Sequence, residues 1–110
     1  MENNRVAQLQ VYLQDTPDDA FLNYALAIEY VGMERDEDAQ PIFERLMAEQ
    51  PEYTATYYHL GALYERAKRK DDAETVYRKG IAITMKNREQ HAMAELQNAL
   101  ANLWIDDEDE

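Results

Sequence analysis

The sequence predicts an all-α fold built from stacked helical hairpins, and three observations support this. Apolar residues recur three and four positions apart through most of the chain, as they do on one face of a helix. No stretch alternates apolar and polar residues in the manner of a half-buried strand. The segment FLNYALAIEY at residues 21–30 returns, 34 residues later, as ATYYHLGALY at residues 55–64. A fixed period of this length is typical of a helical repeat rather than of one mixed core.

Helix start and stop signals divide the chain into six expected helices. Pro17 and Pro51 each precede an acidic segment, which suits the amide end of a helix. Gly32 is expected to stop the second helix, and Pro41 is expected to bend the third by removing an amide donor. A capping box between Asn87 and Gln90 is the reason to break the last long helical stretch. The predicted helices span residues 3–14, 18–31, 36–49, 53–67, 71–85 and 88–104.

Composition and charge exclude several classes of function. The 110 residues carry a net charge of −12, and residues 106–110 are all acidic. An acidic surface repels phosphate, so neither nucleic acid nor an anionic membrane is expected as a partner. The absence of cysteine excludes disulfides and thiolate sites. With no long apolar segment and no signal-peptide pattern at the start, we expect a cytoplasmic protein.

The recurring positions resemble those of the tetratricopeptide repeat family, whose unit is a helix-turn-helix of thirty-four residues. Small residues recur where helices must approach closely, and large ones recur where space between helices must be filled. The first unit supplies Leu26, Ala27, Tyr30, Ala39, Phe43 and Pro51, and the second supplies Tyr57, Leu60, Gly61, Tyr64, Ala73, Tyr77 and Gly80. Departures from the family pattern stand at Asn23, Leu46 and Met85.

The resemblance implies a right-handed helix-turn-helix solenoid that forms a single domain over residues 1–105. Its expected parts are a half repeat at residues 3–17, repeats at 20–53 and 54–87, and a capping helix at 88–105. The acidic residues 106–110 are expected to form a disordered tail, because they have nothing to bury.

The family also implies a non-catalytic module that binds proteins or peptides in a concave groove lined by the first helix of each unit. The matching positions here are mostly apolar or aromatic and lack the Lys and Asn that members use to clamp a carboxylate. Clamping of a chaperone tail is therefore not expected. The groove positions are Phe21, Tyr24, Ile28 and Val31 in the first unit, and Tyr58, Ala62, Glu65 and Arg66, beside Ala55, in the second.

Two other interpretations of these apolar residues remain open. A second copy of the chain could cover them, making the protein a homodimer or larger homo-oligomer with an assembly role. Alternatively, the segment 88–104 could fold over them. Val6, Leu9 and Leu13 lie on one face of the first helix and lack an obvious cover, which favours self-association. The apolar stripe of the last helix, which we expect to pack on the preceding helix, is Met93, Leu96, Leu100 and Leu103.

The residues that could carry chemistry do not form a recognisable active site. His59 and His91 have no partners at zinc-binding spacing, and His91 with Glu95 offers too few ligands for a closed site. The acidic run Asp36–Asp38 begins like a calcium loop, but the later positions do not match, so it is expected to open a helix. The chain contains no serine and no glycine-rich phosphate loop. We expect neither an enzyme nor a cofactor or metal.

Overall fold

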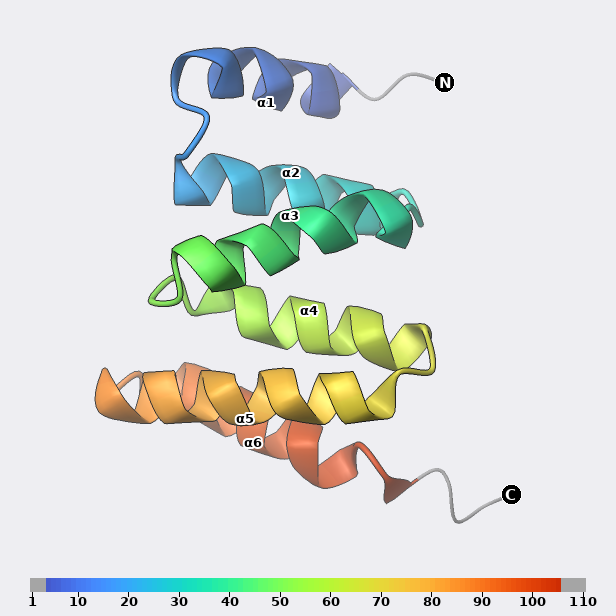
Figure 1. The fold of residues 1–110 in the computed structure, drawn as a ribbon, viewed down its shortest axis with the longest axis vertical. Helices are drawn as coiled ribbons and strands as arrows, with labels where there is room; N and C mark the ends of the chain where they lie inside the picture. Colours follow the sequence, from blue (N-terminus) through green and yellow to red (C-terminus); the bar gives the residue numbers. More distant parts are fainter. Residues whose placement is uncertain (1–3, 106–110) are drawn as a thin grey trace. The chain divides into compact units, whose positions relative to one another are not determined.

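The computed structural model describes residues 4–105, and these residues fold into six α-helices (Figure 1). The all-α class and the sequential antiparallel packing of the helices confirm the prediction from the sequence. Predicted and observed boundaries differ by two residues at most. The helices are α1 (Asn4–Asp15), α2 (Ala20–Gly32), α3 (Asp36–Glu49), α4 (Ala55–Arg66), α5 (Lys70–Lys86) and α6 (Gln90–Asn102).

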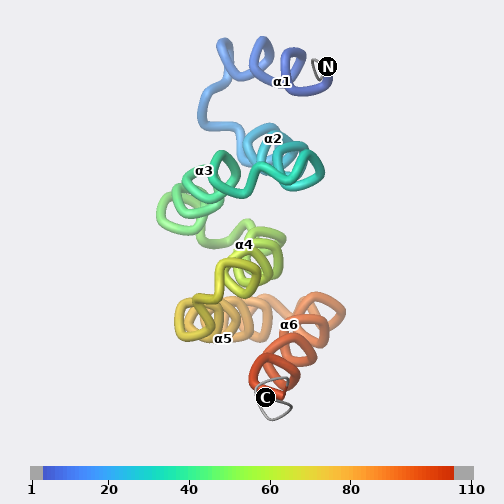
Figure 2. The backbone as a smooth tube through the Cα atoms, turned by 90° about the vertical axis from the view of Figure 1, so that its right-hand side faces the viewer, coloured from blue at the N-terminus to red at the C-terminus, as the bar shows by residue number. Residues whose placement is uncertain are grey.

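The chain divides into two compact units, Met1–Tyr53 and Thr54–Glu110. In the first unit α2 and α3 form a hairpin, and α1 packs on α2. In the second unit α4 and α5 form the corresponding hairpin, and α6 packs on both of them. Figure 2 shows α4 and α5 close to end-on, with α6 beside them. Each unit therefore consists of one helical hairpin and one further helix.

Three helices, α2, α4 and α5, are followed by a residue in the left-handed backbone region, two positions after the last helical residue. These residues are Glu34, Lys68 and Arg88, with φ of 59°, 63° and 60°. A residue in this conformation turns the chain so that the next amides can cap the last carbonyls of the helix. The Arg35, Arg69 and Glu89 amides accordingly donate to carbonyl oxygens five residues earlier, at 2.8, 2.8 and 2.9 Å.

The left-handed residues refine one detail of the sequence analysis and correct another. As expected, α2 ends at Gly32, but Gly32 has no positive φ, and the left-handed turn is made two residues later at Glu34. The break before α6 is real, but its expected cause is wrong. Asn87 is the C-cap of α5, and Glu89 is the N-cap of α6 and makes no side-chain cap bond. The break is made by Arg88, whose left-handed conformation has no signature in the sequence.

The turn inside each hairpin is held by a tyrosine, an arginine and an aspartate at equivalent positions. In the first hairpin, the Arg35 guanidinium lies 5.0 Å from the Tyr30 ring centroid and its Nε is 2.7 Å from Asp38 Oδ2. In the second hairpin, the corresponding distances are 4.5 Å to the Tyr64 ring and 2.8 Å to Asp72 Oδ2. Each exposed pair contributes only a few tenths of a kcal/mol. Their recurrence shows that the sequence repeat encodes one structural unit twice.

The hairpin of α4 and α5 is packed through its two buried glycines. A Cβ on Gly61 would lie 2.2 Å from Cε1 of Tyr77, and a Cβ on Gly80 would lie 2.6 Å from Cβ of Tyr57. Both tyrosines are at most 1% exposed. Leu96 of α6 also lies against Gly80, with its Cδ1 2.9 Å from the added Cβ. Close approach of the helices therefore depends on the missing side chains.

The first unit begins with a helix that buries one side chain completely and pairs with α2. Leu9 is 1% exposed, whereas Val6 and Leu13 are partly exposed. Arg5 Nε lies 3.9 Å from Glu29 Oε2 on α2. At the start of α2, Asp19 caps the Leu22 amide at 2.8 Å.

Two sequence features of the first unit have local explanations. The Asn23 side-chain amide donates to the Pro17 and Asp19 carbonyls, both at 2.9 Å, and so fixes the turn before α2. This is why a polar residue stands where the family favours a large apolar one. Pro41 lies within α3 at an exposed position. The carbonyl of Glu37, which lacks its amide donor, can face water at this exposed place.

The last helix covers the second unit with the predicted stripe. Leu96 and Leu103 are 1% and 2% exposed, and Met93 and Leu100 are partly exposed. This confirms that the stripe packs within its own unit. Beyond the helix, Trp104 Nε1 donates to Glu74 Oε1 at 3.0 Å, and Lys70 Nζ lies 5.5 Å from the indole centroid. The expected tail at 106–110, like the start of the first helix at residue 3, lies outside the described residues.

Candidate interaction surface

The four predicted surface residues of α2 lie on one side of that helix, and the structure exposes them unequally. Phe21, in the first turn, is 59% exposed. Tyr24, Ile28 and Val31 follow at helical spacing and are partly exposed. None of the four is charged, so this face is apolar along its whole length. We refer to Phe21, Tyr24, Ile28 and Val31 as the α2 face.

Tyr24 contributes to packing as well as to the α2 face. Its ring centroid lies 5.6 Å from that of Tyr53 and 6.4 Å from that of Phe43, with tilted planes in both pairs. Such tilted pairs add about 0.5–1.5 kcal/mol beyond the area they bury. Burial, followed by the neighbouring Tyr53, raises the pKa of the Tyr24 hydroxyl. Truncating Tyr24 would therefore disturb the hairpin, whereas truncating Phe21 would remove an exposed ring.

Three of the predicted residues of α4, Tyr58, Ala62 and Glu65, correspond to Tyr24, Ile28 and Val31 of the α2 face, and the α4 set is more polar. Arg66 corresponds to Gly32, and the position of Phe21 is taken by Ala55. Tyr58 is 42% exposed, and its ring meets the His59 ring edge-on at a centroid distance of 5.5 Å. Ala62 and Glu65 are partly exposed, and Arg66 is exposed. We refer to Tyr58, Ala62, Glu65 and Arg66 as the α4 face. One aromatic ring is therefore its main apolar feature.

Glu65 is already engaged by the core of its own hairpin. Its Oε2 accepts a hydrogen bond of 2.5 Å from the hydroxyl of Tyr77 on α5. Burial is the largest cause, and this hydrogen bond the next, of the strongly raised pKa of Tyr77. A carboxylate that accepts from a buried phenol is held in place. Glu65 therefore joins the α4 face to the packing beneath it.

The helix that closes the second unit does not cover the exposed ring of α4. α6 packs on α4, and Glu95 of α6 is close enough to His59 to influence it. Burial and Arg66 lower the pKa of His59, and Glu95 opposes them. Tyr58 nevertheless remains 42% exposed. Cover of this ring by the segment 88–104, one of the open alternatives, is therefore not what the structure shows.

The polar residues considered for chemistry do not form a metal-binding group within the described part of the chain. Among residues 4–105 no group of three or more His, Asp or Glu side chains could hold a metal ion. His91 pairs with Glu95 at 3.3 Å on an exposed part of α6. Asp36, Glu37 and Asp38 form the first turn of α3, as predicted. Within the same described range, no helix is long and apolar enough to cross a membrane.

Besides Trp104 and Ile105, which are 41% and 52% exposed, two exposed apolar regions were not assigned from the sequence. Val11 and Tyr12 of α1 are 57% and 55% exposed. At the other end of the chain, Met85 is 58% exposed beside the turn between α5 and α6. The departure of Met85 from the family pattern was a signal for the second region. For the region of Val11 and Tyr12, the only signal in the sequence was that both residues lie off the apolar stripe of Val6, Leu9 and Leu13.

Comparisons with known proteins agree with this fold. A model of the tetratricopeptide repeat family matches residues 30–103. The solution structure of a tetratricopeptide repeat domain protein from Salinibacter ruber is 41% identical, with a TM-score of 0.75, over 79% of this chain and 88% of that one. A crystal structure of such a domain from the same organism is also 41% identical, with a TM-score of 0.75, over 77% of this chain and 96% of that one.

A protein from Bordetella parapertussis shares the fold at 22% identity, with a TM-score of 0.82 over 97% of this chain and 92% of that one. No curated protein matches the chain. The family model covers well over half of the sequence, and it includes the turns and the buried glycines described above. The chain therefore belongs to the tetratricopeptide repeat family.

Proposed function

We propose that the protein is a non-catalytic interaction module that binds peptides or helices of partner proteins through two surfaces, the α2 face of the first unit and the α4 face of the second. Tetratricopeptide repeat domains are generally protein-interaction modules, and the family gives no indication of catalysis. The observation that carries the proposal is the exposure of Phe21 and Tyr58, at 59% and 42%. Both rings lie on the first helix of a hairpin, where neither contributes to the buried core.

The two rings are suited to binding by burial. Covering an exposed Phe or Tyr ring gains about 1.5–3 kcal/mol from the apolar area removed from water. Aromatic side chains are frequent anchors at protein interfaces because they offer a large area with few rotatable bonds. The α2 face carries no charge, so its partner segment should be apolar there. Arg66 at the end of the α4 face would suit a carboxylate at the edge of the contact.

The experiment compares the partners that the intact chain and the Phe21→Ala/Tyr58→Ala variant capture from the native lysate. Quantitative mass spectrometry measures the captured proteins. We expect the variant to lose the specific partner and to keep its helical circular dichroism spectrum. The Val11→Ala/Tyr12→Ala variant is a matched control, because it removes two side chains of similar exposure from α1. Equal capture by both variants and the intact chain would exclude the α2 and α4 faces as the binding surface.

Self-association is the second candidate, and the exposed Val11 and Tyr12 of α1 favour it. In this case the apolar surface of α1 would be covered by another copy of the chain. Sedimentation velocity at micromolar concentration tests this directly. A dimer that dissociates in the Val11→Ala/Tyr12→Ala variant would support an assembly role. A strict monomer would contradict it and leave binding through the α2 and α4 faces.

A further inference from the structure

The two halves of the chain differ strongly in charge. Residues 1–53 contain three Lys and Arg against twelve Asp and Glu, whereas residues 54–105 contain eight against six. Residues 75–94 contain four Lys and Arg and one acid, Glu89. Arg78 pairs with Glu74, just outside this segment, at 2.9 Å, so Lys79, Lys86 and Arg88 carry the local excess of positive charge. In a chain of net charge −12, this segment is a local cationic region. A basic region on an acidic protein is a candidate contact for an acidic partner.

The same segment forms a hollow at the turn between α5 and α6. The hollow has a volume of about 340 Å³ and is lined by Thr84, Met85, Arg88, Gln90 and Met93. Its size is at the lower end of the range of small-molecule sites, and it is sufficient for one or two side chains of a peptide. We refer to these five residues as the methionine hollow.

The walls of the methionine hollow combine an apolar surface with polar groups at the rim. Met85 is 58% exposed and Met93 is partly exposed. Methionine side chains are flexible and polarizable, and they adapt to apolar groups of varied shape. Thr84 is satisfied within its own helix, since its hydroxyl donates to the Gly80 carbonyl at 2.8 Å. The Arg88 guanidinium and the Gln90 amide therefore remain as the groups that could recognise a ligand.

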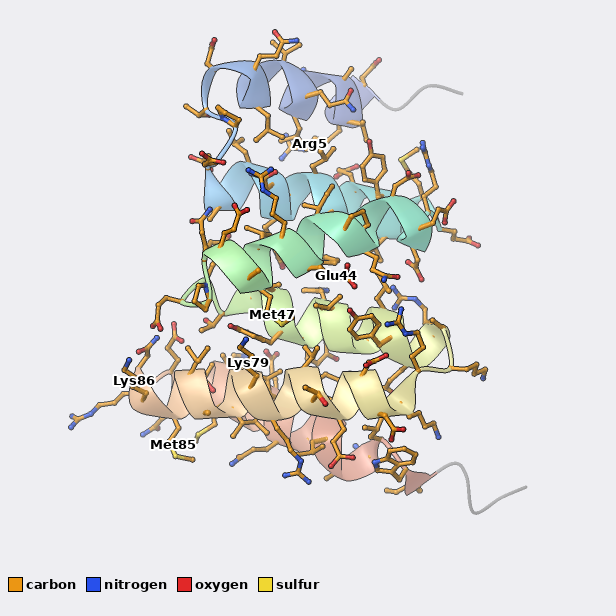
Figure 3. All side chains as sticks on the ribbon, viewed as in Figure 1. Arg5, Glu44, Met47, Lys79, Met85 and Lys86 are labelled. Atoms are coloured by element: carbon orange, nitrogen blue, oxygen red, sulfur yellow. The ribbon has the colours of Figure 1, made fainter. Side chains whose placement is uncertain are left out.

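The position of Arg88 is fixed by the backbone. It occupies the left-handed residue that ends α5, with φ of 60°, and its amide donates to the Met85 carbonyl at 3.2 Å. Lys86, two residues earlier, is also exposed, and Figure 3 shows it with Met85 at the C-terminal end of α5. The planar guanidinium of Arg88 can bind a carboxylate through two parallel hydrogen bonds. The hollow thus places apolar walls beside an exposed arginine whose backbone position is set by the turn.

We propose that the methionine hollow binds an acidic peptide in which an apolar side chain is flanked by carboxylates. The apolar side chain enters between Met85 and Met93, and a flanking carboxylate pairs with Arg88. This surface lies on the second helix of the hairpin and its turn to α6, not on the α2 and α4 faces. The inference is therefore independent of the function proposed above. It identifies a second interaction surface, with an acidic partner rather than an apolar one.

The test uses a fluorescent peptide in which one leucine is flanked by two aspartates on each side, titrated with the full chain. Arg88→Gln should weaken binding by about tenfold, the usual loss for a charge-assisted pair. Lys68→Gln is the matched control, because Lys68 is also an exposed cation at a left-handed helix end, with φ of 63°. It should leave the affinity within about twofold of the original. Replacing the peptide leucine by alanine should also weaken binding.

Methyl spectra of the methionines locate the contact without any variant. Added peptide should shift the methyl signals of Met85 and Met93 and leave those of Met33 and Met47 unchanged. Equal losses for Arg88→Gln and Lys68→Gln would show unspecific attraction and overturn the proposal. The absence of binding, or peptide-induced shifts that spare Met85 and Met93, would overturn it as well. Loss of binding in Phe21→Ala/Tyr58→Ala, with Arg88→Gln unaffected, would assign the peptide to the α2 and α4 faces instead.

Discussion

Where α2 and α3 carry Ala27 and Phe43, the corresponding positions of α4 and α5 carry Gly61 and Tyr77. All four residues are buried. In the second hairpin the tyrosine ring occupies the space that a Cβ of residue 61 would need, and its hydroxyl reaches Glu65. In the first hairpin the residue that corresponds to Glu65 is Val31, which offers no acceptor to a hydroxyl. The two hairpins thus share one architecture but use two matched sets of residues, and these sets should not be interchangeable position by position.

Among exchanges of residues between the two hairpins, the largest effect is expected from placing the alanine of the first hairpin into the second. Gly61→Ala brings a Cβ within 2.2–2.7 Å of three Tyr77 ring atoms. Overpacking of this kind costs about 3 kcal/mol, partly offset by about 1 kcal/mol from the better helix propensity of alanine. Urea denaturation measures the loss.

The Tyr77→Phe background sharpens this comparison. There the ring of residue 77 is no longer tied to Glu65 and can shift away from the added Cβ. Gly61→Ala should therefore lower the free energy of unfolding less in the Tyr77→Phe variant than in the original chain. Strictly additive losses in the double variant would show that the glycine and the tyrosine are not a matched pair.

An intermediate effect is expected from exchanging the ring hydroxyl between the hairpins. Tyr77→Phe removes a hydrogen bond to a carboxylate and should lower the free energy of unfolding by about 1.5 kcal/mol. Phe43→Tyr, the converse change, buries a hydroxyl next to Val31 and should also destabilise, by about 1–2 kcal/mol. Thermal unfolding of the two variants is sufficient to test this. A stabilising Phe43→Tyr would mean that an acceptor other than the one used in the second hairpin is within reach.

The smallest effect concerns the pH dependence of stability. The native pKa of Tyr77 is raised, so above the usual tyrosine pKa of 10.0 the unfolded chain loses this proton while the native chain keeps it. Stability is therefore fully present below pH 10 and falls as the pH rises, by at most about 1.4 kcal/mol per pH unit. Between about pH 9 and about pH 11, the free energy of unfolding should decrease less for Tyr77→Phe than for the original chain. Identical decreases would show that Tyr77 titrates normally.

Much of the fold could be predicted because the packing positions occur twice in the sequence, once in each repeat. The period and the alternation of small and large residues gave the helices, the hairpins and the buried positions such as Leu26 and Leu60. The helix ends were harder to predict, because Glu34, Lys68 and Arg88 adopt a left-handed conformation that is not typical of their residue types. The backbone geometry of the turn, rather than a glycine, decides where these helices stop.

The candidate surfaces could be predicted only in outline. Helical spacing places Tyr24 and Tyr58 at corresponding positions, but it does not show that Tyr24 meets the ring of Tyr53 while Tyr58 stays exposed. It also does not show that Glu65 accepts a bond from Tyr77 on the neighbouring helix. Such details depend on residues brought together by the turn and by the second helix. The methionine hollow was missed for the same reason, since its lining comes from two helices and the residues between them.

The separation of packing residues from surface residues is tested most directly at two neighbouring tyrosines of α4. Tyr57 is 0% exposed and lies against Gly80, whereas Tyr58 is 42% exposed. The measurement is the free energy of unfolding of Tyr57→Ala and of Tyr58→Ala. We predict a loss of about 3–5 kcal/mol for the first and a change within about 0.5 kcal/mol for the second. Comparable losses for both would contradict the assignment of Tyr58 to a surface that is available for a partner.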